Sequence, residues 1–178
     1  MGPITYPVIM THINISEKEG EVIAVQTPLQ GVYYKILKVN ADSRGYFMEV
    51  LRDDWDVLDK MEQVSVSITM PGVIKAFHVH EEQDEILHIL DGMARLVLYD
   101  LRQNSSTKGK LFEKVIGRDV GKEFIFIPRG VAHAYQVLGT EPLRSLYVAN
   151  KVYNKDKPDQ KSIPYDDPTI GFDWTIKS

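Results

Sequence analysis

The segment G-VIKAF-H-V-H-EEQD-E-ILHILD-G, residues 72–92, constrains the fold of this chain more than any other stretch. If it begins with a strand, His78 and His80 point to the same face of a sheet, because successive side chains alternate. Glu85 follows a short polar turn, and His133 lies in a second motif, I-P-R-G-V-A-H-A-Y. Two imidazoles, a carboxylate and a third imidazole from another strand could therefore converge on a metal ion or a proton-transfer centre.

Turn signals and alternating polarity divide most of the chain into short strands. Residues 63–69, Q-V-S-V-S-I-T, alternate strictly between polar and apolar side chains, which is typical of a half-buried strand. Asp91-Gly92 is a strong hairpin signal. We expect strands at residues 32–39, 46–51, 63–69, 73–80, 85–90, 94–101, 111–116, 123–127, 134–138 and 143–149. This pattern predicts an all-β sandwich or barrel.

Segments outside the strands also carry structural signals. Asp53 or Asp54 can cap a short helix that runs to Met61. The C-terminal stretch is rich in proline and aspartate, but it contains four apolar side chains that can anchor it: Tyr165, Ile170, Phe172 and Trp174. We therefore expect a short flanking helix, an ordered tail, an N-terminal arm at residues 1–20 and a single domain at 21–178.

Composition excludes several classes of protein. The formal net charge of −4 gives no broad basic surface for nucleic acid. The chain has no cysteine, which excludes disulfides, thiolate nucleophiles and Cys-type zinc sites. No apolar run reaches the roughly 18 residues of a membrane-spanning helix, and the N-terminus lacks the pattern of a signal peptide. We expect a soluble, cytoplasmic protein without nucleic-acid or membrane partners.

The spacing G-x5-H-x-H-x4-E-x6-G, followed by P-x-G-x2-H, resembles the paired motifs of the cupin superfamily. The resemblance implies a jelly-roll barrel, a double-stranded β-helix. It also implies one divalent metal, such as zinc, manganese, nickel or iron, held by His78, His80, Glu85 and His133. The alternative is a metal-free cluster in which these side chains bond to each other, since buried polar groups must find partners.

A second resemblance covers residues 21–178 and is to the dTDP-4-dehydrorhamnose 3,5-epimerase family, which is also cupin-shaped. The matching segments are D-S-R-G-Y-F-M-E (42–49), V-I-K-A-F-H (73–78), L-Y-D-L-R (98–102), I-P-R-G-V-A-H-A-Y (127–135), S-L-Y (145–147) and Y-D-D-P-T-I-G-F-D-W (165–174). The resemblance implies an isomerase that removes a proton beside the 4-keto group of a dTDP-linked 6-deoxy sugar and returns one from the other face. It also implies a homodimer in which the region 22–39 exchanges strands with its partner.

The same resemblance implies roles for individual residues. His78 corresponds to the catalytic base, Asp167 to the carboxylate that pairs with it, and Tyr147 to the tyrosine that returns the proton. Substrate-binding or pocket positions correspond to Arg44, Gln63, Lys75, His133 and Tyr153. Structural alternatives exist, because Asp167 could cap a turn before a proline, the two tyrosines could be core residues, and the arginine could belong to an ordinary turn.

The chain departs from the family pattern around the expected base. Lys75 replaces an arginine, Glu85 replaces a lysine that lies near the keto oxygen, and His80 is an additional histidine. A metal could supply the positive charge that a developing enolate needs. His78 cannot easily be both metal ligand and base, so either His78 is the base of a metal-free site or another residue, such as Tyr147, is the base.

Two other functions remain open from the sequence. A metal-dependent cupin enzyme could act on another small molecule, and a non-catalytic module could bind nucleotide sugars without converting them. His88 has the opposite strand parity from Glu85, so we expect it on the sheet surface and outside the site.

Overall fold

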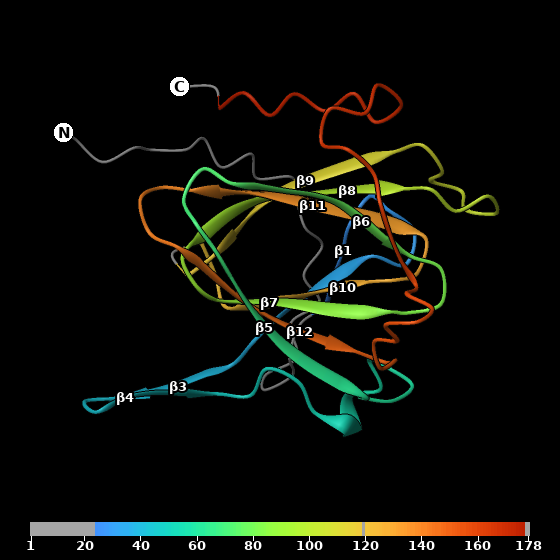
Figure 1. Ribbon diagram of the computed structural model, residues 1–178. Helices are drawn as coiled ribbons and strands as arrows, with labels where there is room; N and C mark the ends of the chain where they lie inside the picture. The colour runs from blue at the N-terminus through green and yellow to red at the C-terminus, as the bar shows by residue number, and fades with distance from the viewer. Residues whose placement is uncertain (1–23, 119, 177–178) are drawn as a thin grey trace.

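The computed structural model describes residues 24–118 and 120–176, and these residues form mainly β-strands and their connections (Figure 1). The arm expected at residues 1–20 lies outside the described ranges. Within those ranges, none of the helical structure has the length and apolar character that crossing a membrane requires.

Two antiparallel sheets face each other and form the barrel (Figure 1). The first has six strands, in the order β1 (Ala24–Gln26), β2 (Tyr33–Ile36), β10 (Glu123–Ile127), β7 (Glu85–Asp91), β12 (Leu143–Ala149) and β5 (Gln63–Thr69). The second has five, in the order β13 (Gln160–Ser162), β6 (Ile74–His80), β11 (Val131–Leu138), β8 (Met93–Asp100) and β9 (Leu111–Gly117). Neighbouring strands are often distant in sequence, as in a jelly roll, and the predicted all-β cupin-type barrel is confirmed.

The main core lies between the two sheets. Leu87 and Ile125 of the six-stranded sheet belong to the same buried cluster as Leu96 and Leu98 of the five-stranded sheet, and each is at most 2% exposed. Burial of one such side chain contributes about 1.5–3 kcal/mol. This packing fixes the two sheets relative to each other, and with them the strands that carry the predicted site.

β5 presents its apolar side to solvent, which reverses the usual arrangement of a half-buried strand. Val64, Val66 and Ile68 are 64, 62 and 60% exposed. The alternate side chains line a cavity between the sheets: Gln63, Ser65 and Ser67. β5 is also the last strand of its sheet, so its outer edge has no partner strand within the described residues.

The predicted helix is wrong in its length. A single 3₁₀ turn, η1 (Asp53–Trp55), replaces the helix expected to reach Met61. Asp56 ends it by adopting a left-handed conformation with a φ angle of 51°. Trp55 and Leu58 nevertheless pack on the outer face of the six-stranded sheet, so the apolar spacing reflects burial rather than a continued helix.

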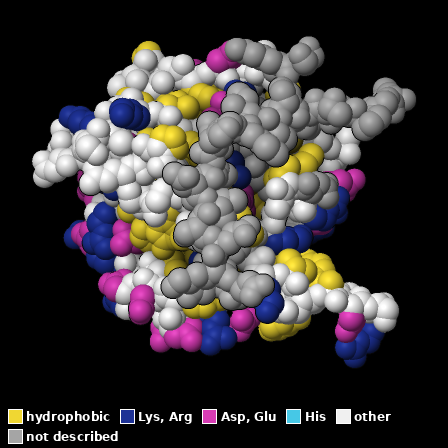
Figure 2. Space-filling view, turned by 180° about the vertical axis from the view of Figure 1, so that it is seen from behind, with side chains coloured by type: hydrophobic (Ala, Val, Ile, Leu, Met, Phe, Trp, Pro, Cys, Tyr) yellow, Lys and Arg dark blue, Asp and Glu magenta, His cyan; other side chains and the backbone are white. Residues whose placement is uncertain are grey.

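The strands predicted at residues 32–39 and 46–51 also differ from the structure. The first divides into β2 and β3 (Val39–Asp42), because the backbone N–H of Leu37 bonds to the carbonyl of Lys122 and the chain then turns away. β3 pairs with β4 (Gly45–Met48) in a hairpin that projects from the body. Charged side chains mark the tip of this hairpin in Figure 2, with apolar side chains behind it.

The C-terminal tail packs against the five-stranded sheet, as predicted. Ile170, Phe172 and Trp174 join a cluster around Phe77, and the ring centroids of Trp174 and Phe77 are 6.0 Å apart. Tyr165 is exposed, and its backbone carbonyl accepts the indole N–H of Trp174. β13, which the sequence did not predict, pairs with β6 and carries the tail alongside the predicted site.

Candidate functional site

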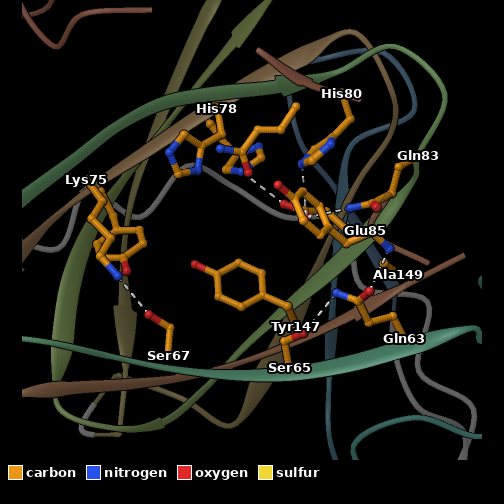
Figure 3. Close-up of a pocket in the computed structure, with 14 residues that line it drawn as sticks. Gln63, Ser65, Ser67, Lys75, His78, His80, Gln83, Glu85, Tyr147 and Ala149 are labelled. Atoms are coloured by element: carbon orange, nitrogen blue, oxygen red, sulfur yellow. Dashed lines mark hydrogen bonds and ion pairs between the residues drawn. The ribbon is translucent and has the colours of Figure 1, made fainter. Parts of the chain in front are cut away.

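A cavity of about 240 Å³ lies between the two sheets (Figure 3). The six-stranded sheet lines it with Gln63, Ser65, Ser67, Glu85, Tyr147 and Ala149. The five-stranded sheet lines it with Lys75, His78, His80, His133, Tyr135 and Gln160. Pockets for drug-sized ligands usually measure about 300–1,000 Å³, so this cavity suits a group the size of one sugar ring.

A β-bulge brings three side chains of β6 to the cavity. His78 lies opposite His133 of β11, whereas Lys75 lies opposite Tyr135. Three steps along β6 therefore match two steps along β11, which is the defining feature of a bulge. Lys75 faces the cavity together with His78 and His80, although simple alternation would turn it away. The sequence predicted the common face of the two histidines but not the bulge.

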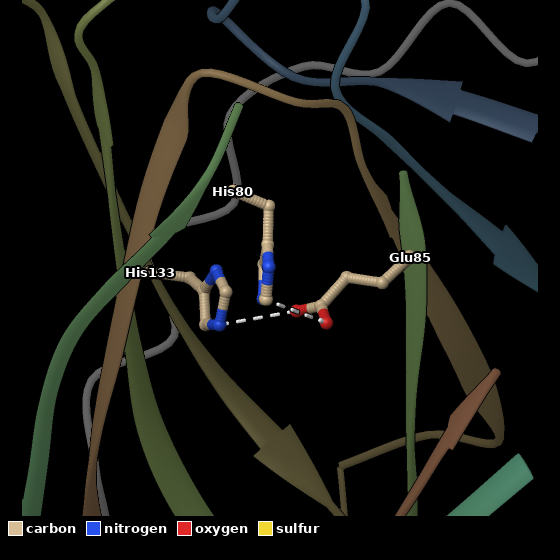
Figure 4. A group of neighbouring side chains, drawn as sticks. All are labelled: His80, Glu85 and His133. Atoms are coloured by element: carbon tan, nitrogen blue, oxygen red, sulfur yellow. Dashed lines mark ion pairs between the residues drawn. The ribbon is translucent and has the colours of Figure 1, made fainter. Parts of the chain in front are cut away.

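His80, Glu85 and His133 form a compact group on one side of the cavity (Figure 4). His133 Nε2 lies 3.0 Å from Glu85 Oε1, and His80 Nε2 lies 3.7 Å from Glu85 Oε2. The possible ligand atoms of the three residues all lie within 4.8 Å of one another. His78, the fourth metal ligand that the sequence predicted, is not part of this group.

The turn between β6 and β7 supports this group from outside. Asp159 Oδ2 lies 3.5 Å from His80 Nδ1, and the same carboxylate accepts the backbone N–H groups of residues 81–83. Gln83 donates to Glu85 Oε2 at 3.4 Å. The short polar turn that precedes Glu85 therefore helps to position two of the three clustered side chains.

Burial dominates the protonation of the clustered side chains. It raises the pKa of Glu85 to about 7, although His80 and Gln83 favour the charged form. It lowers the pKa of His133 to about 4, and it also lowers the pKa of His80, against the opposing effect of Glu85. Each charged form is disfavoured because the surrounding protein solvates it less well than water does.

His78 and Tyr147 have protonation states that suit proton transfer. Burial, reinforced by the two neighbouring histidines and Lys75, lowers the pKa of His78 to about 4. Burial also raises the pKa of Tyr147, and Tyr135 and Glu85 act in the same direction. Near neutral pH, His78 is therefore a neutral imidazole that can accept a proton, and Tyr147 is a phenol that can donate one.

Lys75 lies on the opposite side of the cavity from Glu85 (Figure 3). Lys75 Nζ donates to Ser67 Oγ at 2.8 Å. Among the described residues that line the cavity, Lys75 is the one lysine or arginine. Tyr147 projects from β12 into the space between Lys75 and Glu85, so the cavity has a cationic side, a carboxylate side and a phenol between them.

Gln63 and Tyr153, which the sequence assigned to substrate binding, are both at the cavity. Gln63 Oε1 accepts the backbone N–H of Tyr153 at 2.7 Å, and Gln63 Nε2 donates to Ser65 Oγ at 3.1 Å. The side chain of Tyr153 is exposed and lines the cavity from the segment after β12. Gln63 therefore links the polar face of β5 to the segment that carries Tyr153.

Two predicted site residues lie away from this cavity. Arg44 occupies the turn of the β3–β4 hairpin, where its side chain is 88% exposed and pairs with Asp42 at 2.6 Å. Asp167 lies in the tail, where its carboxylate accepts the backbone N–H of Thr169 at 2.8 Å. Within the described residues, no hydrogen bond or ion pair joins Asp167 to His78.

His88 is buried rather than on the sheet surface, and that prediction is wrong. It is 2% exposed, and its Nδ1 lies 2.7 Å from the carbonyl oxygen of Glu123. His88 shares a face of β7 with Ile86, which is covered by the apolar cluster around Trp55. The alternation of side chains along β7 did predict that His88 lies outside the cavity. It is a core residue with a hydrogen-bond partner.

Sequence reasoning missed several residues of the site. Ser65 and Ser67 belong to an alternating segment whose polar face normally points to solvent, so their place in the cavity was not apparent. Asp159 lies in a proline-rich stretch without periodicity, and no sequence pattern marks it. Only the pairing of β13 with β6 brings Asp159 next to His80.

Comparison with known proteins gives consistent matches. Residues 26–178 match the family described as dTDP-4-dehydrorhamnose 3,5-epimerase. The spore coat polysaccharide biosynthesis protein SpsL of Bacillus subtilis is 48% identical over 149 residues, which are 84% of this chain and 98% of that protein. The probable low-salt glycan biosynthesis epimerase Agl13 of Haloferax volcanii is 37% identical, over 84% of this chain and 96% of that protein. A crystal structure of dTDP-4-dehydrorhamnose 3,5-epimerase from Elizabethkingia anophelis is 29% identical, with a TM-score of 0.75 over 88% of this chain and 87% of that one.

Proposed function

Because this chain belongs to the dTDP-4-dehydrorhamnose 3,5-epimerase family, and epimerases are isomerases, we propose that it epimerises a dTDP-linked 4-keto-6-deoxy sugar. One observation carries the proposal: His78 and Tyr147, on facing sheets, line the same sugar-sized cavity. The similarity to SpsL supports a role in polysaccharide biosynthesis. We place the enzyme in the cytoplasm, with which its cysteine-free sequence is compatible.

His78 is the proposed base. The hydrogen on the carbon beside the keto group is removed as a proton by a ring nitrogen of His78. The electron pair of the broken C–H bond forms the carbon–carbon double bond of an enolate, and the negative charge moves to the keto oxygen. A neutral imidazole at the cavity wall suits this step, because a general base must accept the proton within hydrogen-bond reach.

Tyr147 is the proposed acid. Inversion requires that the proton return to the other face of the planar enolate carbon. Tyr147 projects from β12 of the six-stranded sheet, whereas His78 belongs to β6 of the five-stranded sheet. A sugar ring held between the two sheets would expose one face to each residue. The phenol donates its proton to carbon. After product release the resulting phenolate recovers a proton from solvent, and the imidazolium of His78 loses to solvent the proton that it accepted.

Lys75 is the proposed source of positive charge for the enolate oxygen. A developing oxyanion in a water-poor site is strongly stabilised by a cation or a fixed hydrogen-bond donor. Glu85 cannot supply this charge, whereas Lys75 lies on the other side of the cavity, near His78. The divalent zinc, manganese, nickel or iron ion that the sequence predicted would add a second positive charge on the His80, Glu85 and His133 side.

Asp167 is proposed as the carboxylate that orients His78 when substrate is bound. β13 runs beside β6, with Ser162 opposite His78, so the following tail starts close to the proposed base. A carboxylate on the far nitrogen would fix the ring orientation and stabilise the protonated imidazole. Gln63, His133 and Tyr153 are proposed to contact the sugar at the cavity wall and rim.

Proton exchange in deuterated water tests the proposed reaction. The protein is incubated with dTDP-4-keto-6-deoxyglucose, and the C3 and C5 protons of the sugar are followed by NMR. Exchange at one or both carbons is expected, and the pattern identifies the centres that are inverted. The His78→Asn variant should exchange these protons at least about 100-fold more slowly than the wild type. Tight sugar binding without any exchange in the wild type would instead indicate a non-catalytic binding module.

We also propose that the enzyme is a homodimer. The outward row of Val64, Val66 and Ile68 is a contiguous apolar strip on an edge strand, and such strips commonly mark interfaces. Arg44 lies on a projecting hairpin away from the cavity of its own chain, so a second copy would give it a substrate to bind. The cavity fits one sugar ring, which leaves the nucleotide free to contact that neighbouring hairpin.

A further inference from the structure

We infer that His80, Glu85 and His133 form a three-ligand site for a divalent transition-metal ion, and that His78 remains outside it. The inference concerns metal binding alone. It can therefore hold or fail independently of the sugar reaction proposed above.

The distances within the group match those of a metal site. Metal–nitrogen and metal–oxygen bonds of about 2.0–2.2 Å place two ligand atoms of a tetrahedral site about 3.3–3.6 Å apart. The observed separations are 3.0 Å between His133 Nε2 and Glu85 Oε1, and 3.7 Å between His80 Nε2 and Glu85 Oε2. The two histidines approach different oxygens of Glu85, and with one ligand atom from each residue all separations lie within 4.8 Å. One ion can therefore reach all three side chains once they draw together by about 1 Å.

Hydrogen bonds account for one oxygen of Glu85, which accepts from Gln83, but not for the other. Glu85 Oε1 is buried and has no hydrogen-bond partner, although His133 Nε2 is only 3.0 Å away. An unpartnered polar atom in the interior is costly and calls for a missing partner. His80 and His133 direct ring nitrogens toward the same carboxylate (Figure 4), and a cation between them would satisfy all three groups.

The donor set indicates the class of metal. Two imidazole nitrogens and one carboxylate oxygen suit zinc, manganese, iron or nickel better than calcium or magnesium, which prefer oxygen ligands. Three protein ligands beside a cavity leave a coordination position open, as in catalytic rather than structural sites. A metal bound there would supply a Lewis acid on the side of the cavity opposite Lys75.

Asp159 completes the site as an outer partner. Its carboxylate lies 3.5 Å from the far nitrogen of His80, and backbone N–H groups of the β6–β7 turn hold it in place. Carboxylates at this position orient metal-bound histidines and raise their basicity. Because His78 is not in the group of converging ligand atoms, its ring is left free for the proton transfer proposed for it.

Metal binding without substrate tests the inference. The full-length protein is dialysed against a chelator, and Zn²⁺ and Mn²⁺ are titrated separately by calorimetry, with metal content measured by mass spectrometry. One equivalent per chain is expected for at least one of the two metals. Glu85→Gln should weaken binding by at least about 100-fold, and Asp159→Asn by about 10–100-fold. His78→Asn should keep the affinity within about threefold.

Cobalt substitution separates metal binding from folding. The visible absorption of bound Co²⁺ reports its ligands, while circular dichroism verifies that each variant is folded. Asp159→Asn keeps all three ligands and should retain the Co²⁺ spectrum at saturation. Failure of the wild type to bind any tested metal stoichiometrically would overturn the inference. If His78→Asn lost as much metal affinity as Glu85→Gln, the assignment of only three ligands would be overturned. Sugar exchange is measured separately, so either result is independent of the proposed reaction.

Discussion

At the scale of single residues, Lys75 is the one lysine or arginine among the described residues that line the cavity, and it lies across the cavity from Glu85. The bulge in β6 turns Lys75 into the cavity beside His78. If Lys75 stabilises the enolate, Lys75→Met should slow exchange by about 100–1,000-fold, because the neutral side chain cannot pair with a developing oxyanion. The substrate Kd, measured by calorimetry, should change by less than about tenfold.

Two comparisons distinguish this role from simple binding. Lys75→Arg keeps the charge and should recover part of the lost rate. Ser67→Ala removes the partner that holds the ammonium group at 2.8 Å and should change the rate by less than about tenfold. An equal loss of binding and rate in Lys75→Met would mean that Lys75 stabilises substrate and transition state alike.

At the scale of elements, Asp100 shows how a loop that looks featureless can be organised by one buried carboxylate. Asp100 ends β8 and accepts hydrogen bonds from Arg102, Ser105 and Thr107 at 2.9, 2.6 and 2.6 Å. Thr107 also accepts the backbone N–H of Gln30 at 2.9 Å, which ties the loop after β8 to the loop after β1. These contacts hold the pKa of Asp100 well below its usual value, although burial opposes them.

The low pKa of Asp100 predicts a pH dependence of stability. Its contribution is complete above the unfolded pKa of about 4 and is lost as the pH falls toward the lower folded pKa, because the unfolded chain then binds the proton first. In urea titrations below about pH 4, Asp100→Asn should reduce the slope of unfolding free energy against pH by up to about 1.4 kcal/mol per pH unit. At pH 7 it should cost about 2–3 kcal/mol. If the unfolding free energies of the wild type and of Asp100→Asn changed in parallel with pH, the pH dependence could not be assigned to Asp100.

Much of the barrel could be predicted because its strands follow period-two patterns and its turns carry glycine and proline signals. Such patterns fix local conformation, but not what covers a given face. His88 and β5 were therefore misjudged in opposite directions: the histidine is buried, and the valines of β5 are exposed. The grouping of His80, Glu85 and His133 could be predicted from their spacing, whereas the position of Asp159 could not, since it depends on the pairing of β13 across the sheet.

At the scale of the whole molecule, the proposed dimer predicts that two inactive variants can complement each other. Arg44→Ala should weaken substrate binding, and His78→Asn should remove the base. If Arg44 serves the partner's cavity, a hybrid dimer contains one site with both defects and one with neither. When the two variants are mixed in equal amounts and their subunits exchange at random, half of the dimers are hybrids. One of the two sites in each hybrid is intact, so the mixture should recover about a quarter of the wild-type rate of proton exchange. NMR exchange rates before and after mixing measure this.

A monomeric variant provides the matched control. Val66 points outward from β5, away from the cavity, so Val66→Lys places an unpaired charge at the proposed interface without touching the site. It should raise the dimer Kd by roughly 100-fold, about 2.7 kcal/mol, as measured by light scattering, and abolish complementation when built into both chains. Val120→Lys places the same charge at another exposed valine, and it should neither raise the dimer Kd nor abolish complementation. Full activity in monomeric Val66→Lys would show instead that each cavity binds its substrate without help from a second copy.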